Sequence, residues 1–135
     1  MAWWASVTPN MDGQVFAPVT PPLTRSKEIY VQLLASNGGN GQIGKHHKGL
    51  LRQAGFVGIT TSATYEVYSS DKAVRHQEQT LAQAWTENTL VEQVTRNGYA
   101  SLEEVQRISR AWQEWGANPD AFFADAWFAA LGWKE

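Results

Sequence analysis

The spacing of hydrophobic residues changes several times along the chain, and each change predicts a different element. The apolar run over 2–8, AWWASVT, predicts a buried strand that ends in a proline-containing turn over 9–13. Apolar and polar residues alternate over 57–67, which predicts a strand of up to a dozen residues. The nearly continuous apolar stretch over 121–135 fits either a buried strand or a short buried helix. Its aromatic content and its flanking proline and glycine favour a strand.

A helical period of three to four residues governs the segment between the first two strands. Residues 23–36 place their leucines and isoleucine on one face, and Asn37-Gly38 supplies a left-handed stop. A second amphipathic helix carries apolar residues from Ile43 to Ala54 and ends at Gly55. We therefore expect two helices before the long strand.

The fifty residues after that strand are also predicted to be helical. Ser69 or Ser70 supplies a cap for one helix, and Asn97-Gly98 ends another. Ser101-Leu-Glu-Glu104 is a capping box, in which the serine oxygen accepts a backbone N–H and Glu104 reaches back to the cap. The stripe of apolar residues behind this box makes it the clearest helix in the chain.

Composition limits the classes of protein to which the chain can belong. It has 135 residues, enough for about one domain, with 43% hydrophobic and 18% charged residues, as in globular proteins. A net charge of −2 offers no broad basic surface for nucleic acid, and the absence of cysteine excludes disulfides and thiolate sites. The first apolar run is too short for a membrane span and lacks the basic start of a signal peptide, so we expect a cytoplasmic protein.

The glycines in NGGNGQIGK raise the question of a nucleotide site. From Gly39 the spacing is that of a dinucleotide-binding turn, and it is one residue short of a phosphate-binding loop. A dinucleotide turn follows a strand, whereas an amphipathic helix precedes these glycines, and His46 stands where a phosphate-binding loop needs Ser or Thr. We interpret 38–41 as a turn between two helices and Gly44 as a position of close packing.

Three basic residues, Lys45, His46 and Lys48, crowd the start of the second helix, where positive charge opposes the helix dipole. They suit an anionic group on a ligand or partner, or they are solvated side chains on an exposed turn; both interpretations stay open. The adjacent histidines point to different sides of a helix and have no third ligand nearby, so no metal site is expected.

Other candidate chemistry is weak. Glu66 lies between Tyr65 and Tyr68 near the end of a strand, as a general base would, but surface carboxylates at strand ends are common. The aromatic residues in WQEWG resemble a cation cage, yet Trp112 and Trp115 belong to the packing stripe of their helix. Residue spacing alone assembles no active site.

The order of the elements resembles the second half of a class I S-adenosylmethionine-dependent methyltransferase. IGKHHKGLLRQAGFVGITTSATYEVYSS is similar to the segment in which a helix ending in Leu-Leu-x-x-Ala-Gly-Phe leads into a late strand of that family. AWWASVTPNMDG resembles its fifth strand and the following loop. NPDAFFADAWFAALGWK resembles its last strand, particularly in a bacterial small-molecule subgroup with a helical insertion before that strand.

This resemblance implies an α/β fold, or α+β if the chain is taken alone. It would be a three-stranded partial sheet from the second half of a Rossmann-like methyltransferase fold, with about five helices. We expect a single domain over 1–135 with a helical insertion at about 70–117. The final strand would run antiparallel between the other two and leave 2–8 as an open edge, which is a template for pairing. A homodimer through that edge is expected, or a separate cofactor-binding chain.

The implied function is the substrate side of a methyltransferase-like protein. Nothing in the chain matches the glycine-rich turn and ribose-binding carboxylate of the family's first half, so S-adenosylmethionine is implied by resemblance only. The chain alone is expected to be inactive and to bind no cofactor. Candidate substrate contacts lie in the loop after the first strand, at the start of the second helix and on the long strand: Asn10, Met11, Asp12, Lys45, His46, Tyr65 and Tyr68.

Two alternatives remain beside this interpretation. One is a non-catalytic dimeric module that binds a small ligand beside Tyr65, Tyr68 and the helical insertion. The other is an unrelated small α+β enzyme, which needs an active site that residue spacing does not supply. None of the three interpretations calls for nucleic acid or a membrane as a partner.

Overall fold

The computed structural model describes residues 2–135 and has a mixed α/β fold. In chain order the elements are β1 (Ala2–Pro9), the 3-10 helix η1 (Met11–Gly13), β2 (Val15–Ala17), α1 (Pro21–Ser36), the 3-10 helix η2 (Ile43–His46), α2 (His47–Gln53), β3 (Val57–Tyr68), α3 (Asp71–Ala84), α4 (Asn88–Arg96), α5 (Leu102–Ala117) and β4 (Phe122–Lys134). The strands and helices predicted from hydrophobic spacing are all present, and the ambiguous last segment is a strand.

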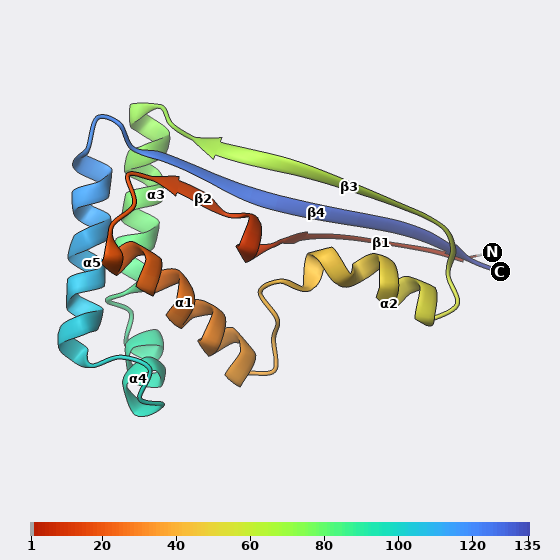
Figure 1. Ribbon diagram of the computed structural model, residues 1–135, viewed down its shortest axis with the longest axis horizontal. Helices are drawn as coiled ribbons and strands as arrows, with labels where there is room; N and C mark the ends of the chain where they lie inside the picture. The colour runs from red at the N-terminus through yellow and green to blue at the C-terminus, as the bar shows by residue number, and fades with distance from the viewer. Residues whose placement is uncertain (1) are drawn as a thin grey trace. The chain divides into compact units, whose positions relative to one another are not determined.

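The sheet is built around β4. This strand pairs antiparallel with β1, from Ala2 opposite Lys134 to Pro9 opposite Trp127, and it also pairs with β2 and β3. Figure 1 shows β4 between β3 and β1. The expected count of three strands was wrong by one, because the chain becomes extended again after η1 and pairs with β4 a second time as β2.

The chain divides into two compact units, which we describe separately. The sheet unit comprises residues 2–15, 40–66 and 124–135, and the helical unit comprises residues 16–39 and 67–123. Strands β3 and β4 contribute residues to both units.

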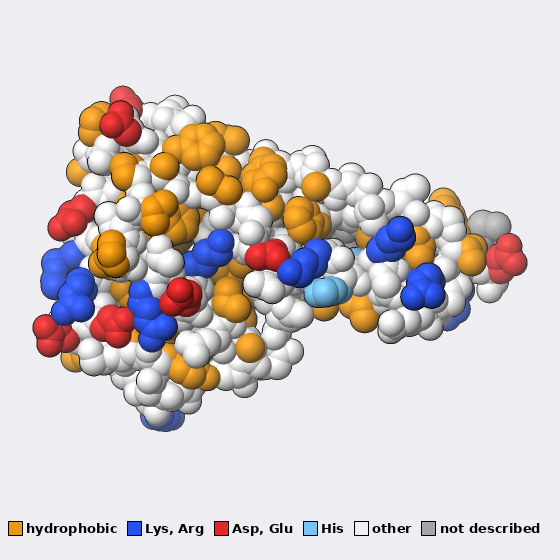
Figure 2. Space-filling model, in the orientation of Figure 1, with side chains coloured by type: hydrophobic (Ala, Val, Ile, Leu, Met, Phe, Trp, Pro, Cys, Tyr) orange, Lys and Arg blue, Asp and Glu red, His pale blue; other side chains and the backbone are white. Residues whose placement is uncertain are grey.

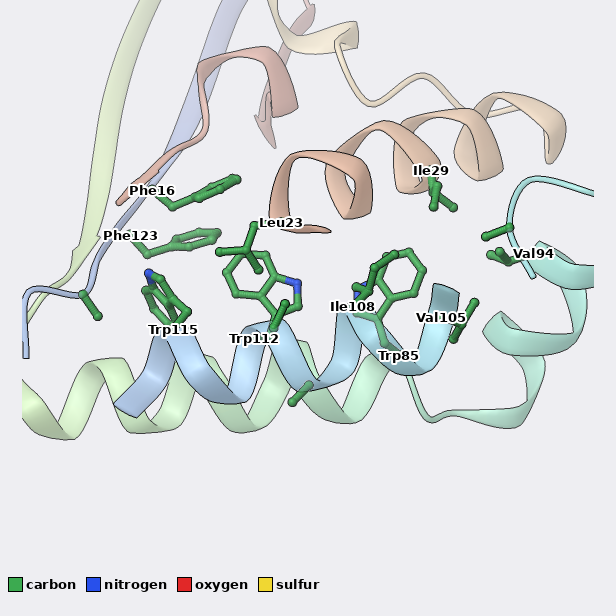
Figure 3. Close-up of a cluster of buried hydrophobic side chains, with 14 of the residues drawn as sticks. Phe16, Leu23, Ile29, Trp85, Val94, Val105, Ile108, Trp112, Trp115 and Phe123 are labelled. Carbon is green, nitrogen blue, oxygen red and sulfur yellow. The ribbon is translucent and has the colours of Figure 1, made fainter. Parts of the chain in front are cut away.

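The helical unit has a core of large aromatic and aliphatic side chains, shown in Figure 3. The Phe16 and Phe123 rings are stacked with their centroids 6.0 Å apart, and the Trp112 and Trp115 rings meet edge to face with their centroids 5.5 Å apart. The Trp115 Nε1–H also donates to the Ala17 carbonyl at 2.9 Å. Both tryptophans of α5 are buried, which confirms that they pack in the core and form no exposed cation cage.

The ends of the helices follow the predicted capping chemistry. Ser70 Oγ accepts from the Ala73 N–H at 3.2 Å, and Ser101 Oγ accepts from the Glu104 N–H at 3.1 Å. Only half of the predicted capping box forms as described, because the Glu104 carboxylate accepts from Arg25 Nε of α1. Glu104 therefore links α5 to α1, where its predicted role was to close its own helix.

One face of the sheet unit is covered by α2. The Trp4 ring contacts His47 edge to face at 5.9 Å, and a Cβ added to Gly132 would lie 3.5 Å from the Leu51 Cδ1 of α2. The buried positions of β4 within the sheet unit are small: Ala124, Ala126, Ala130 and Gly132. Small side chains let the helix approach the sheet closely, so this layer is thin.

The opposite face of the sheet unit has no helix of its own unit among the described residues. Residues that stand opposite each other in an antiparallel pair project to the same face, so Trp3 and Val7 share this face with Trp133. Trp3 is 63% exposed and Val7 is 65% exposed, and no residue of β1 is buried. The prediction of a buried strand over 2–8 was therefore wrong, because no second layer among the described residues of the sheet unit covers this face. The strand predicted from the alternation over 57–67 is confirmed as β3. Most side chains of β3 are exposed, like those of β1. We call this surface of β1 and β4, around Trp3, Val7 and Trp133, the bare face.

Candidate functional site

The turn after β1 and the segment before α2 are joined by backbone hydrogen bonds. The Asn10 N–H donates to the Ala126 carbonyl at 2.9 Å, which fixes the end of β1 against β4. The Met11 N–H donates to the Gly41 carbonyl at 2.8 Å. We call this group, residues 10–13, residues 41–45 and Tyr65, the loop cluster.

Side chains hold the same two segments together. The buried Asn10 side chain accepts from the Lys45 N–H through Oδ1 at 3.3 Å. The Lys45 ammonium forms an ion pair with the Asp12 carboxylate. Because both side chains of the pair are partly exposed, this ion pair orients Lys45 more than it stabilises the fold.

Two glycines permit the close approach of these segments. A Cβ on Gly13 would lie 2.7 Å from the Ala126 Cβ. A Cβ on Gly44 would lie 3.0 Å from Thr8 Oγ1 and 3.1 Å from the Phe128 Cβ. The interpretation of Gly44 as a position of close packing is therefore confirmed, and Gly13 has the same role without having been singled out in the sequence.

The interpretation of residues 38–41 as a turn between helices is confirmed as well. Helix α1 precedes these residues and η2 follows them. A dinucleotide-binding turn requires a strand before its glycines, and here a helix stands in that place. Gly38 adopts φ +83°, and the Gly39 N–H donates back to the Leu34 carbonyl at 2.8 Å. These are the bonds of a helix C-terminus, with glycine in the left-handed conformation.

The structure brings most of the candidate residues together, with one exception. Tyr65 reaches the loop cluster, where its hydroxyl donates to the Gly13 carbonyl at 3.0 Å. His46 is exposed and adjoins Lys45 in η2. Tyr68 belongs to the helical unit, where its ring meets Phe123 edge to face at 6.0 Å. Within the sheet unit the site therefore contains Asn10, Met11, Asp12, Lys45, His46 and Tyr65.

Unused hydrogen-bonding groups lie buried in the loop cluster and next to it. Asn10 Nδ2 and Thr8 Oγ1 are buried and have no hydrogen-bond partner within residues 2–135. Asn10 is 1% exposed, so bulk water does not satisfy its amide. Buried polar atoms without partners are infrequent in folded proteins, and they often accompany a bound water, ion or functional group.

Asp125 is a further candidate that was not predicted from the sequence. Burial raises the pKa of its carboxyl, a hydrogen bond from Gln14 Nε2 at 3.1 Å opposes that rise, and the negative charge of Glu66 adds to it. Carboxyls with a raised pKa recur at functional sites, although structural networks perturb pKa values too. The available signal was a single charged residue within the apolar run over 121–133.

On the face shown in Figure 2, basic side chains gather over α2, whereas acidic and basic side chains are mixed over α5. Within the described part of the chain, no group of three or more histidine, aspartate or glutamate side chains is arranged to hold a metal ion. Across residues 2–135, no helix combines the length and the apolar character that a membrane crossing requires.

With this geometry in place, the chain was compared with known proteins. No family model and no curated protein matches it. The functional assignment below therefore rests on the residues and geometry of this chain and on the resemblance described above.

Proposed function

We propose that this chain is the substrate-side part of an S-adenosylmethionine-dependent methyltransferase-like protein. The cofactor-binding region would lie elsewhere, in the same polypeptide or in a separate chain. The observation that carries the proposal is the order of the strands. Strand β4 lies between β1 and β3 and runs antiparallel to β1, which is the arrangement that the sequence resemblance implied for the last three strands of a Rossmann-like sheet.

The open edge of the sheet gives further support. The register pairs every residue of β1 with β4, and among the described strands β4 is the one that pairs with β1. An unpaired edge next to exposed apolar side chains such as Trp3 and Val7 is a template for another strand. The proposal assigns this edge and the bare face to the cofactor-binding region.

The loop cluster is the substrate-side element in this proposal. It follows β1, as does the substrate-enclosing loop that the resemblance implies. It supplies a buried amide, an ion pair and a tyrosine hydroxyl within one small region, from Asn10, Asp12, Lys45 and Tyr65. S-adenosylmethionine enters the proposal through the resemblance alone, and we assign none of its contacts to this chain.

Reading the coding sequence upstream of the Met1 codon tests the proposal. We expect the upstream DNA to encode, in frame with this chain, an acidic-x-Gly-x-Gly-x-Gly turn. If the cofactor-binding region is a separate chain, we expect the adjacent open reading frame to encode that turn. Calorimetric titration should then show S-adenosylmethionine binding to the longer polypeptide or to the pair of chains, and no binding to this chain alone. An in-frame stop codon directly upstream, together with no such turn in the adjacent open reading frame, would contradict the proposal.

A non-catalytic dimeric ligand-binding module is the second candidate, and the same β1 edge favours it. A second copy would cover the edge by strand pairing across a twofold axis. Light scattering at tens of micromolar is expected to give the mass of a dimer, and Trp3→Lys is expected to weaken the dimer at least tenfold, or about 1.4 kcal/mol. A monomer at that concentration would rule out this candidate.

A further inference from the structure

A groove lies in the sheet unit between the start of α2 and strands β3 and β4. Its volume is about 370 Å³, and all of its lining residues belong to the sheet unit: Gly44, Lys45, Lys48, Thr61, Ser62, Ala63, Phe128 and Ala129. It borders the loop cluster, because Gly44 and Lys45 belong to both.

The lining has a definite chemical character. Lys45 and Lys48 provide two ammonium groups, and Thr61 and Ser62 provide two hydroxyl groups. The Phe128 side chain and the neighbouring alanines are apolar. None of the described lining residues is acidic. A carboxylate or phosphate group with an attached apolar body would find complementary groups for both of its parts here.

The two lysines are not neutralised equally. Lys45 has Asp12 as an ion-pair partner, whereas no ion pair is found for Lys48 within residues 2–135. The lysines are three residues apart on the continuous helical stretch of η2 and α2, so they lie on one face and repel each other. An anion between them would replace this repulsion with attraction.

The wall behind Gly44 adds an independent observation. A Cβ on this glycine would lie 3.0 Å from Thr8 Oγ1 and 3.4 Å from Asn10 Oδ1, so both polar side chains lie directly behind it. Thr8 Oγ1 and Asn10 Nδ2 are the buried atoms without hydrogen-bond partners described above. The two atoms lie behind Gly44 and outside the lining of the groove, so they add unused hydrogen-bonding capacity to its wall and no direct contact with a ligand.

We propose that this groove binds a small molecule that carries an oxyanion, a carboxylate or a phosphate monoester, on an apolar ring or chain. The oxyanion contacts the ammonium groups of Lys45 and Lys48 and the hydroxyl of Thr61 or Ser62. The apolar body lies on Phe128. This inference goes beyond the methyltransferase-like function and does not rest on it, because the groove is complete within this chain.

The test is a nitrogen-15 NMR titration of the full chain with phenyl phosphate and, separately, with benzoate. Phenol and inorganic phosphate serve as probes for the apolar part and the anion alone. We expect saturable shifts at residues 44–48, 61–63 and 128–129, with phenyl phosphate or benzoate binding at least fivefold more tightly than phenol. A response to one acid only would identify which oxyanion the groove prefers.

Substitutions make the test specific to the groove. Lys48→Gln is expected to weaken binding at least fivefold, and Lys72→Gln on α3 of the helical unit serves as the matched control that leaves binding unchanged. Because Lys48 is exposed, its replacement is not expected to change the fold, which the undisturbed parts of the spectrum would verify. Equal binding by Lys48→Gln and the parent would overturn the proposal.

Two further outcomes would also overturn it. Phenol binding as tightly as phenyl phosphate and benzoate would mean that the groove recognises apolar surface only. Shifts from phosphate or phenyl phosphate scattered over unrelated lysines would mean an adventitious ion only. The upstream coding sequence has no bearing on any of these results, so failure of this inference is distinguishable from failure of the proposed function.

Discussion

The two units use tryptophan in opposite ways. In the helical unit Trp85, Trp112 and Trp115 are 5%, 2% and 3% exposed. In the sheet unit Trp3, Trp4 and Trp133 are 63%, 41% and 39% exposed, and Trp127 is half-buried. Tryptophan therefore forms a closed core in the helical unit, whereas most tryptophans of the sheet unit keep a large exposed fraction.

The difference follows from the number of layers within each unit. In the helical unit α5 packs against α1, α3 and α4, so each apolar stripe meets another. In the sheet unit α2 covers one face of β1 and β4, and the bare face has no second layer of its own. The bare face therefore keeps apolar side chains exposed, whereas the apolar side chains of the helical unit are covered by its own helices.

The largest expected effect comes from the closed core. Trp112→Ala should lower the free energy of unfolding by about 3–5 kcal/mol, because it removes a buried aromatic side chain and leaves a cavity. The matched change Trp3→Ala in the sheet unit should alter it by less than about 0.5 kcal/mol. Urea unfolding at low micromolar concentration measures both. Equal costs for the two changes would contradict the contrast between the units.

An intermediate effect is expected at the loop cluster. Gly13→Ala should destabilise the chain by about 1–3 kcal/mol, because the new methyl group would lie 2.7 Å from the Ala126 Cβ, which is fixed to the backbone of β4. Gly49→Ala in α2 is the control, since nothing lies within 4 Å of its added Cβ. That control should stabilise the helix by about 0.5–1 kcal/mol. Thermal unfolding that ranks the two variants in the opposite order would disprove the tight contact.

The smallest effect concerns the charge of Asp125. Its pKa is raised in the folded chain, mainly by burial, so the charged carboxylate is less favourable there than in the unfolded chain. This penalty is present above the folded pKa and disappears below the unfolded value of about 3.9. Asp125→Asn, which keeps an acceptor for Gln14, should therefore raise the melting temperature at pH 7 but not at pH 3. A rise of equal size at both pH values would exclude a charge effect.

The elements were largely predictable because their signals are local. Alternation over β3, the glycine stops at Gly38, Gly55 and Gly98, and the serine caps at Ser70 and Ser101 depend on neighbouring residues only. All three glycines adopt positive φ, as a left-handed stop requires. Features that depend only on neighbouring residues can be predicted from the sequence without knowledge of the fold.

The candidate site was only partly predictable because it depends on contacts between distant segments. The sequence singled out Asp12 and Lys45 separately, but not the ion pair between them. Asp125 was missed because its raised pKa comes from burial and from Glu66 on another strand. Residues 2–8 were predicted to be a buried strand and Trp112 to be part of the core, and the structure confirms only the prediction for Trp112. Hydrophobic spacing does not reveal whether a second layer covers a strand.

The pairing of β3 with β4 has a consequence for how this fold tolerates change in length. The two strands are neighbours in the sheet, yet residues 69–121 separate them along the chain, so forming the pair closes a long loop. The entropy cost of loop closure grows only with the logarithm of loop length, and each doubling adds about 0.6 kcal/mol. Helices can therefore be added or removed between these strands at little cost to the sheet, provided that they fold among themselves.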